Sequence, residues 1–267
     1  MTDLQLFDIG ANLSHASFRH DLAQVLERAR AAGVAQMIVT GASESESRSA
    51  HDIAAAHPGA LFSTAGVHPH LAREWTAATA TAIRELATSP VVVAVGEAGL
   101  DFNRDFSPRP VQEKVFAAQL ELAVELGMPI FMHERDAHDR FVAILGEFLP
   151  RLGPAVIHCF TGEAAELDRY LELGLYVGIT GWICDERRGT HLRELVSRIP
   201  LERLMLETDS PYLLPRDLEP RPKGRRNEPM HLAHIARAVA ACRCMDAAEL
   251  ALETTRTART FFSLEAP

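Results

Sequence analysis

Eight short apolar runs, each followed by a longer polar or amphipathic stretch, constrain the fold of this chain more than any other feature. The runs are rich in β-branched residues and have the length of strands, whereas the stretches between them have helical spacing and several end at a glycine. We predict strands at residues 4–9, 35–41, 60–67, 91–97, 129–134, 154–160, 175–180 and 203–209. Helical sequence is predicted from Met230 to the end of the chain.

This alternation indicates a particular sheet architecture. Near-continuous apolar strands are buried on both faces, and strands that alternate with helices pair in parallel. Eight such units predict a (β/α)8 TIM barrel of the α/β class, whereas the alternative, a doubly wound open sheet, usually has fewer strands. Since no stretch reads as a linker, we expect one TIM-barrel hydrolase domain over residues 1–267.

Charge and composition limit the partners of the chain. Asp and Glu number 36 against 27 Lys and Arg, a net charge of −9, so a nucleic acid would have to bind in a local cleft rather than by bulk attraction. No window of about 18 apolar residues is present, and the start, MTDLQLFD, lacks the features of a signal peptide. We therefore expect a cytoplasmic protein without a membrane partner, and a monomer.

The four cysteines also favour a cytoplasmic location. They have no zinc-finger spacing, and free thiols suit a reducing environment. Cys242 and Cys244 lie in a helical pattern, where their spacing puts them on different faces, so we expect them to be helix residues.

Polar residues interrupt the apolar runs at their carboxyl ends. They are Asp8, His68, His70, Glu97, His133, His158 and Asp209. The carboxyl ends of all strands of a barrel meet at one mouth, where the active sites of this fold lie. We therefore expect Glu97, His133, His158 and Asp209 to converge there.

Two imidazoles and two carboxylates form a mixed nitrogen and oxygen ligand set for a divalent cation. The set suits a divalent transition ion such as Zn²⁺ or Mn²⁺, with oxygen positions left for water or Mg²⁺. A cation with open positions polarises a substrate oxygen and activates water, so the set indicates metal-assisted hydrolysis. A single strand histidine is more often a hydrogen-bonded core residue, and the joint placement of the four is what favours a metal site.

Other residues near these strand ends have two interpretations. His68 either faces a substrate or belongs to a turn held by Pro69. The loop PRDLEPRPKGRRNEP is either a solvated loop or a phosphate-binding segment, because guanidinium groups match phosphate oxygens. We predict that Arg225, Arg226 and Arg135 hold the phosphate. His15, His20, His51, His57, His191 and His234 show no converging partner in the sequence.

Eight sequence blocks carry a resemblance to a known family. In order they are FDIGANL, STAGVHPH, VGEAGLDFNRDFS, FMHERDAH, IHCFTG, GWICDERRG, ETDSPYLLPRDL and RRNEPMHL. Together they resemble the TatD family of metal-dependent deoxyribonucleases. The resemblance implies a Mg²⁺-dependent 3′-5′ exonuclease that acts on single-stranded DNA and RNA, in DNA repair and nucleic-acid turnover. It also implies metal ligands at Glu97, His133 and His158, with Asp209 binding metal and orienting or deprotonating the attacking water.

The first strand departs from the broader family. Most members have Asp-x-His-x-His there, with two histidines for a second metal, whereas this chain has Asp8, Gly10 and Asn12. We therefore expect any second ion to bind weakly and through water, at Asp8, Asn12 or a bridging Glu97.

Two other functions compete with a nuclease. One is an amidohydrolase-like enzyme acting on a small cyclic amide or ester, which shares the expected fold and ligand types but usually needs the missing histidine pair. The other is a non-catalytic nucleic-acid binder with a degenerate site, which the complete set of four candidate ligands disfavours.

Overall fold

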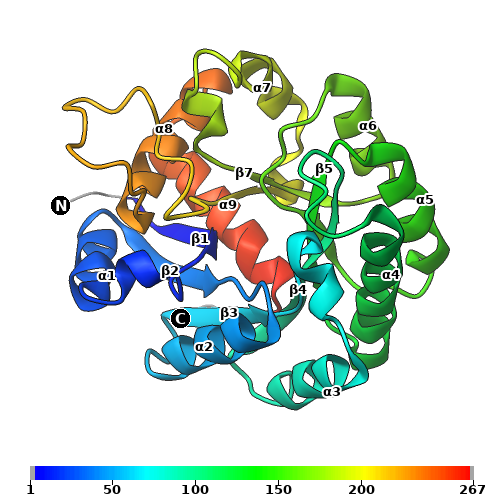
Figure 1. The fold of residues 1–267 in the computed structure, drawn as a ribbon. Helices are drawn as coiled ribbons and strands as arrows, with labels where there is room; N and C mark the ends of the chain where they lie inside the picture. The colour runs from blue at the N-terminus through cyan, green and yellow to red at the C-terminus, as the bar shows by residue number, and fades with distance from the viewer. Residues whose placement is uncertain (1–3, 265–267) are drawn as a thin grey trace. The chain divides into compact units, whose positions relative to one another are not determined.

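The computed structural model describes residues 4–264 and contains one sheet of eight parallel strands in chain order (Figure 1). The strands are β1 (Leu6–Ala11), β2 (Val34–Val39), β3 (Leu61–Ala65), β4 (Val92–Asp101), β5 (Ile130–Arg135), β6 (Ala155–Ile157), β7 (Tyr176–Ile179) and β8 (Leu204–Leu206). A parallel bridge from Ala11 to Ser210 joins the end of β1 to the segment after β8. The predicted (β/α)8 barrel is confirmed.

Nine α-helices and six short 3₁₀ helices connect and flank these strands within the described residues. The α-helices are α1 (Leu22–Ala31), α2 (Glu44–Ala55), α3 (Ala77–Leu86), α4 (Arg109–Leu126), α5 (His138–Phe148), α6 (Ala164–Glu172), α7 (Thr190–Leu195), α8 (Leu232–Cys242) and α9 (Ala247–Phe261). The 3₁₀ helices are η1 (Ala16–Phe18), η2 (Pro69–Glu74), η3 (Gly181–Cys184), η4 (Val196–Arg198), η5 (Leu201–Arg203) and η6 (Pro229–His231).

Helix ends follow local sequence signals. Gly127 ends α4 in the left-handed region, at φ 63°, and a capping box of Thr76 and Thr79 begins α3. The prediction that both Cys242 and Cys244 are helix residues is wrong for the second. Cys242 ends α8, whereas Cys244 lies beyond the helix with φ 53°.

Contacts divide the chain into two compact units. We call Val39–His158 the central unit, and Met1–Ile38 together with Cys159–Pro267 the terminal unit. The single domain expected from the sequence stays a prediction. Each unit has its own core. In the central unit Phe116 stacks on Phe141 at 4.9 Å between ring centroids, and in the terminal unit Phe7 stacks on Phe262 at 6.1 Å.

Several strands differ in length from the prediction, among them β4, β6 and β8. β4 continues four residues past Glu97, to Asp101, with all ten of its residues buried. β6 and β8 are only three residues long, because the chain leaves the regular ladder where its polar residues begin. After β8, Asp209 has φ 52° and its N–H donates to the Gly10 carbonyl. The ends of the predicted strands are therefore the least regular parts of the sheet.

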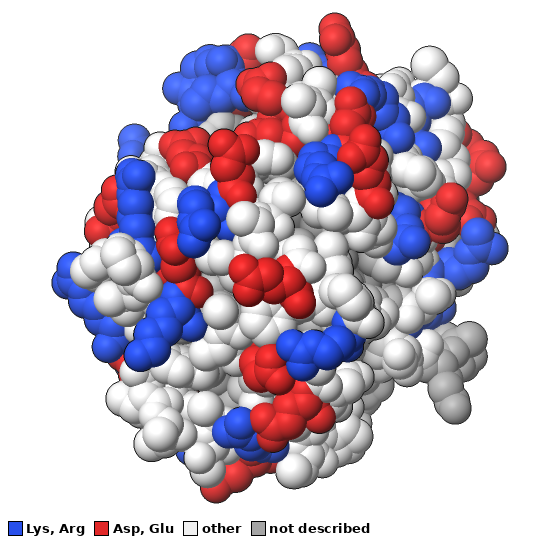
Figure 2. All heavy atoms as spheres, turned by 90° about the vertical axis from the view of Figure 1, so that its right-hand side faces the viewer, with Lys and Arg blue, Asp and Glu red and all other residues white. Residues whose placement is uncertain are grey.

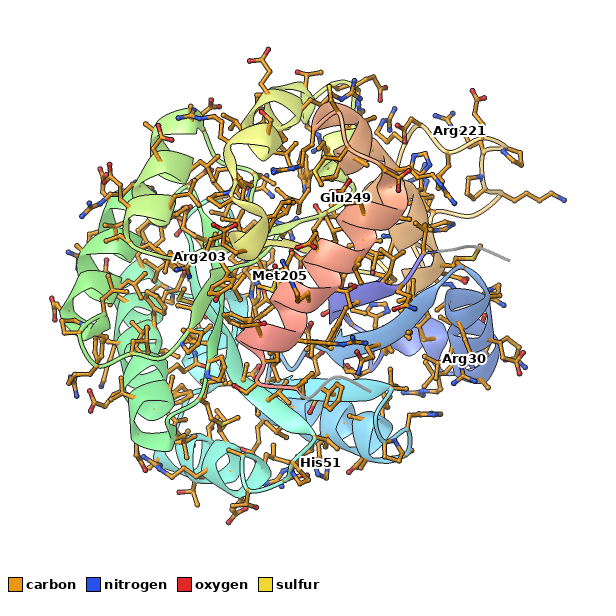
Figure 3. The ribbon with its side chains drawn as sticks, turned by 180° about the vertical axis from the view of Figure 1, so that it is seen from behind. Arg30, His51, Arg203, Met205, Arg221 and Glu249 are labelled. Atoms are coloured by element: carbon orange, nitrogen blue, oxygen red, sulfur yellow. The ribbon has the colours of Figure 1, made fainter. Side chains whose placement is uncertain are left out.

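The loop between β8 and α8 stands out from α8 in Figures 1 and 3, with Arg221 exposed on it. On the face drawn in Figure 2, basic side chains lie among acidic ones. Several such pairs connect neighbouring helices, for example Arg84 with Glu125 and Arg140 with Glu113, each at 2.6 Å. None of the helices in residues 4–264 is both long and apolar enough to cross a membrane.

Candidate active site

An irregularity in β4 positions Glu97. Along the β4 and β5 pair, Val95 lies opposite Ile130 and Ala98 opposite Met132, so β4 contains one extra residue at this point. Such a bulge redirects a side chain from the regular alternation of a strand. Gly99 permits the close approach of the two strands, because a Cβ there would lie 1.9 Å from the His133 carbonyl oxygen. Glu97 is consequently buried, with 6% of its surface exposed.

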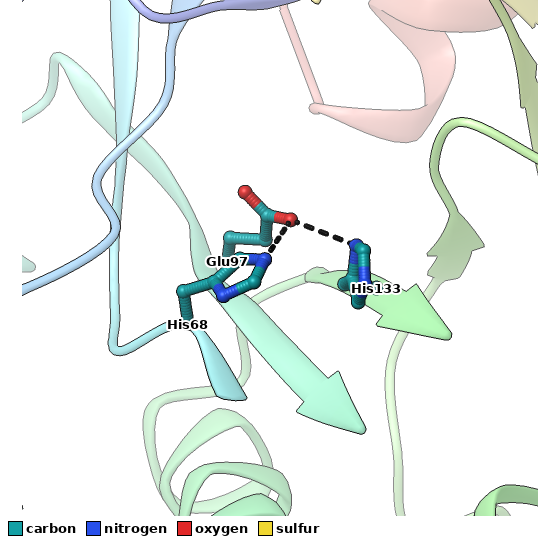
Figure 4. A group of neighbouring side chains, drawn as sticks. All are labelled: His68, Glu97 and His133. Carbon is teal, nitrogen blue, oxygen red and sulfur yellow. Dashed lines mark ion pairs between the residues drawn. The ribbon is translucent and has the colours of Figure 1, made fainter. Parts of the chain in front are cut away.

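Three imidazoles surround one carboxylate oxygen of Glu97. The Oε1 atom lies 2.8 Å from His158 Nε2, 3.3 Å from His133 Nδ1 and 3.2 Å from His68 Nε2. Figure 4 shows His68 and His133 on either side of this oxygen. Each histidine lies at or just beyond the carboxyl end of a different strand, as the position of active sites in barrels predicts. Glu97, His133 and His158 are therefore brought together, and His68 joins them.

A second carboxylate, Asp101, extends this cluster. Its Oδ2 atom lies 2.7 Å from His70 Nε2 and 3.4 Å from His133 Nε2, and its Oδ1 accepts from the Arg104 and Asn103 N–H groups. We did not predict a role for Asp101. The signal that could have found it is its position four residues after Glu97 in VGEAGLD, which is an even spacing in a strand.

Burial and mutual contacts shift the pKa of these groups in opposite directions. Burial alone raises the pKa of Glu97, but the neighbouring imidazoles of His158, His68 and His133 outweigh it and hold that pKa well below its usual value. Burial lowers the pKa of His68 to about 4, although Glu97 opposes this. At neutral pH Glu97 is therefore ionised and His68 is uncharged, which are the ligand forms of both side chains.

The donor set fits a divalent cation. His68, Glu97 and His133 each offer one ligand atom, and these atoms lie within 4.8 Å of one another. In addition, His133 Nε2 is buried, and its 3.4 Å contact with Asp101 Oδ2 lacks the geometry of a hydrogen bond. Buried polar atoms without a partner are uncommon, and a ligand is one reason for them. Carboxylate oxygen and imidazole nitrogen suit Mg²⁺, Mn²⁺ or Zn²⁺, with no sulfur in the set.

Asp209 and Asp8 belong to the terminal unit. Asp209 accepts a hydrogen bond from the Asn12 side-chain amide at 2.9 Å. Asp8 is fully buried and accepts from the Thr208 hydroxyl at 2.6 Å, from the Thr208 N–H at 2.9 Å and from the Gly10 N–H at 3.2 Å. Burial raises the pKa of Asp8 to about 7, although these hydrogen bonds oppose it. Its carboxylate thus connects the middle of β1 to the segment just after β8, and its role in a weak second metal site stays a prediction.

The predicted phosphate-binding arginines have different surroundings. Arg226 donates to Asp21 at 2.6 Å and to Glu228 at 2.7 Å, so its guanidinium is held by two carboxylates. Arg225 is exposed and makes no ion pair with a described residue, whereas Arg135, at the end of β5, is half-buried. Arg225 is therefore more available to a ligand than its neighbour.

His234, for which the sequence shows no converging partner, has one in the structure. His234 Nε2 lies 2.6 Å from Asp217 Oδ1, and Cys184 completes a group of three possible ligands with them. The expectation that His234 has no converging partner is wrong, because Asp217 reaches it from the loop after β8.

Comparisons with known proteins give the family of this chain. Residues 7–263 match the family model described as TatD related DNase. The chain is 55% identical over 259 residues to a protein of Erwinia tasmaniensis named 3′-5′ ssDNA/RNA exonuclease TatD, with 97% of this chain and all of that one covered. A protein of Pantoea vagans with the same name is 56% identical over the same coverage.

A solved structure has the same fold. It is the crystal structure of YJJV, a TatD homologue from Escherichia coli, which superposes with a TM-score of 0.88 and 26% sequence identity over 99% of this chain and 100% of that one. The family match spans the segments that carry every residue of the cluster around Glu97. This chain belongs to the family of TatD-related DNases.

Proposed function

We propose that this chain is a metal-dependent phosphodiesterase that removes nucleotides from the 3′ end of single-stranded DNA and RNA. One observation carries the proposal: a buried carboxylate oxygen with three imidazole nitrogens within 3.3 Å, in a chain of this family. The direction and the substrate come from the name of relatives that are more than half identical over nearly the whole chain.

Glu97, His133 and His158 are the proposed metal ligands, with Mg²⁺ as the working cation. When bound, such a cation supplies Lewis-acid stabilisation of the negative charge that develops on a phosphate oxygen. His158 is held against Phe131, with 4.7 Å between ring centroids, and is only 5% exposed, so its nitrogen is fixed in place. His68, predicted to face the substrate, shares the same Glu97 oxygen and can serve as a hydrogen-bond partner of the phosphate or as a further ligand.

The protein residues supply the remaining steps. Asp209 is proposed to bind metal and to orient the attacking water or take its proton, with Asn12 fixing its carboxylate. Arg225 and Arg135 are proposed to hold the scissile phosphate. For Arg226 to do so, its guanidinium would have to leave Asp21 and Glu228. We propose a monomeric cytoplasmic enzyme, and a role in DNA repair stays a prediction.

The experiment that tests this function is degradation of a single-stranded oligonucleotide labelled at its 5′ end. With Mg²⁺ we expect a ladder that shortens from the 3′ end, its loss with EDTA, and its recovery when Mg²⁺ is returned. A parallel oligonucleotide with phosphorothioate linkages at its 3′ end should resist degradation. Release of a labelled 5′ nucleotide first, or turnover of lactones and cyclic amides in place of DNA, would contradict the proposal.

A further inference from the structure

A second group of metal-type donors lies in the terminal unit, outside the cluster around Glu97. It contains Cys184, the last residue of η3, Asp217 of the loop after β8, and His234 in the first turn of α8. One ligand atom from each residue lies within 4.8 Å of the other two. Three different segments thus bring a sulfur, an oxygen and a nitrogen to one place.

The three donors are already oriented toward one another. His234 Nε2 lies 2.6 Å from Asp217 Oδ1, and the Cys184 sulfur lies within 4.8 Å of a ligand atom of each of the other two residues. Ligand atoms of a tetrahedral zinc site lie roughly 3.3–3.8 Å apart, given metal–ligand distances of about 2.0–2.3 Å. The three atoms would therefore have to shift by about 1 Å or less to enclose an ion.

The group is closed on one side and open on the other. Cys184 is buried, with 1% of its surface exposed, whereas the side chains of Asp217 and His234 are 44% and 30% exposed. An ion can thus reach the group from solvent and keep a water as its fourth ligand. Open access and a rigid inner ligand are features of a usable metal site.

The surrounding contacts keep the donors in place without an ion. η3 packs on α8, and Arg193 of α7 donates to the Ile183 carbonyl beside Cys184. Arg216, next to Asp217, lies 3.7 Å from Asp185, which ties the loop to the segment after η3. A Cβ on Gly181 would meet the Leu213 carbonyl at 2.5 Å, so only glycine allows the loop to approach η3 this closely.

We propose that Cys184, Asp217 and His234 bind a borderline transition-metal cation, of which Zn²⁺ is the representative, and that this cation fixes the loop between β8 and α8. Thiolate and imidazole ligands favour Zn²⁺, Co²⁺ or Fe²⁺ over the hard cation Mg²⁺. Burial, together with Asp217, raises the pKa of the Cys184 thiol, so that binding releases the thiol proton to solvent. This site is separate in chemistry from the sulfur-free cluster around Glu97.

The sulfur ligand provides a direct test with the full-length protein. After removal of metals by a chelator, Co²⁺ is added in steps, and the near-ultraviolet charge-transfer band of a thiolate–cobalt bond is recorded. We expect this band in the wild type and in Glu97→Ala, because the Glu97 cluster contains no sulfur. We expect no band in Cys184→Ser, and an unchanged band in the matched control Cys244→Ser, whose cysteine is exposed and outside the group.

Two further variants keep the test decisive if Cys184→Ser does not fold. Asp217→Asn and His234→Gln change partly exposed side chains, and each should weaken Co²⁺ and Zn²⁺ binding by more than about tenfold, since loss of even an indirect metal contact costs about 10- to 100-fold. Addition of Zn²⁺ should abolish the cobalt band and slow proteolysis of the loop. The proposed site would be wrong if the wild type showed no cobalt band, or if the band persisted in Cys184→Ser or was lost in Glu97→Ala. Unchanged metal affinity in both Asp217→Asn and His234→Gln would also contradict it.

Discussion

The side-chain amide of Asn12 donates a hydrogen bond to Asp209 Oδ1 at 2.9 Å. Two backbone bonds lie beside it, from Asn12 N–H to the Ser210 carbonyl at 2.7 Å and from Asp209 N–H to the Gly10 carbonyl at 2.8 Å. Most members of the broader family have an imidazole where this chain has Asn12. Here the strand-one residue is therefore a hydrogen-bond donor to the proposed catalytic carboxylate.

Asn12→Ala should lower kcat on single-stranded DNA by about 10- to 100-fold, the effect of losing one hydrogen bond to a charged group. The reason is that Asp209 loses a contact that fixes its carboxylate. The measurement is steady-state kinetics with saturating Mg²⁺. Asn103→Ala removes an exposed amide that bonds to Asp136 and should leave kcat unchanged. Equal rates for Asn12→Ala and the wild type would remove Asn12 from the mechanism.

Asp101→Asn should weaken Mg²⁺ binding by about 10- to 100-fold, as loss of a partner behind a ligand does, with much of the activity restored at high Mg²⁺. Asp101 lies 3.4 Å from His133 and is expected to orient that ring. Glu97→Gln should instead abolish activity at any Mg²⁺ concentration. The measurements are calorimetric Mg²⁺ titration and activity against Mg²⁺. Asp105→Asn, which breaks an exposed pair with Arg109, is the control and should match the wild type.

Gly99→Ala should destabilise the fold more than Gly59→Ala, the same substitution at another glycine with positive φ. At φ 141° a new Cβ would lie 1.9 Å from the His133 carbonyl oxygen, which forces β4 and β5 apart. We expect a loss of more than about 3 kcal/mol in the free energy of unfolding. Gly59→Ala also places a side chain at positive φ, 78°, but in open space, so it should cost only about 1–2 kcal/mol. Denaturant unfolding measures both, and equal losses would show that the close approach of the strands is unimportant.

Asp8→Asn should change how stability depends on pH. The pKa of Asp8 is about 7 in the folded protein and 3.8 as its ordinary value, so its contribution to stability is fully present below pH 3.8 and is lost as pH rises to about 7. That gap corresponds to at most about 4 kcal/mol. Asparagine keeps the shape, and its amide can donate to the Thr208 hydroxyl. The wild type should therefore lose stability relative to Asp8→Asn between pH 4 and 7. A constant difference over this range would contradict the assigned pKa.

Two adjacent arginines should give opposite results. Arg225→Gln should raise KM for single-stranded DNA and reduce its dependence on salt, because an exposed cation that contacts phosphate releases a counterion. Its thermal stability should not change. Arg226→Gln should lower the free energy of unfolding by about 1–3 kcal/mol, since Asp21 and Glu228 lose a charged partner. Denaturant unfolding and salt-dependent kinetics separate the two, and a reversal of the pattern would reassign the phosphate contact to Arg226.

The pattern of strands and helices could be predicted from the sequence because buried parallel strands are almost wholly apolar. The convergence of Glu97, His133 and His158 follows from the same pattern, since polar residues at the ends of parallel strands meet at one edge. Their role as metal ligands stays a prediction, as does that of Asp209.

Residue positions that depend on contacts between distant segments were not predicted, although the spacing of Asp101 from Glu97 was a sequence signal for one of them. Asp101 enters the cluster because β4 continues through a bulge that depends on β5. Asp217 is positioned by contacts of its loop with η3 and α8. Because Cys184 is far from Asp217 in the sequence, no local pattern indicated that the two residues lie close together. Arg226 pairs with Asp21, 205 residues earlier, so its sequence neighbours gave no sign of it.

The bond between Asp8 and Thr208 has a consequence for the order of synthesis. The two residues are 200 positions apart, so at roughly 5–20 residues per second a ribosome needs roughly 10–40 s after making the first to make the second. During that interval β1 has no β8 segment to contact, and the Asp8 carboxylate has no hydrogen bond from Thr208. The central unit, in contrast, is one continuous segment that is complete before β8 is made. Every residue of the cluster around Glu97 is therefore synthesised before the last strand and before Thr208, through which β1 contacts the segment after it.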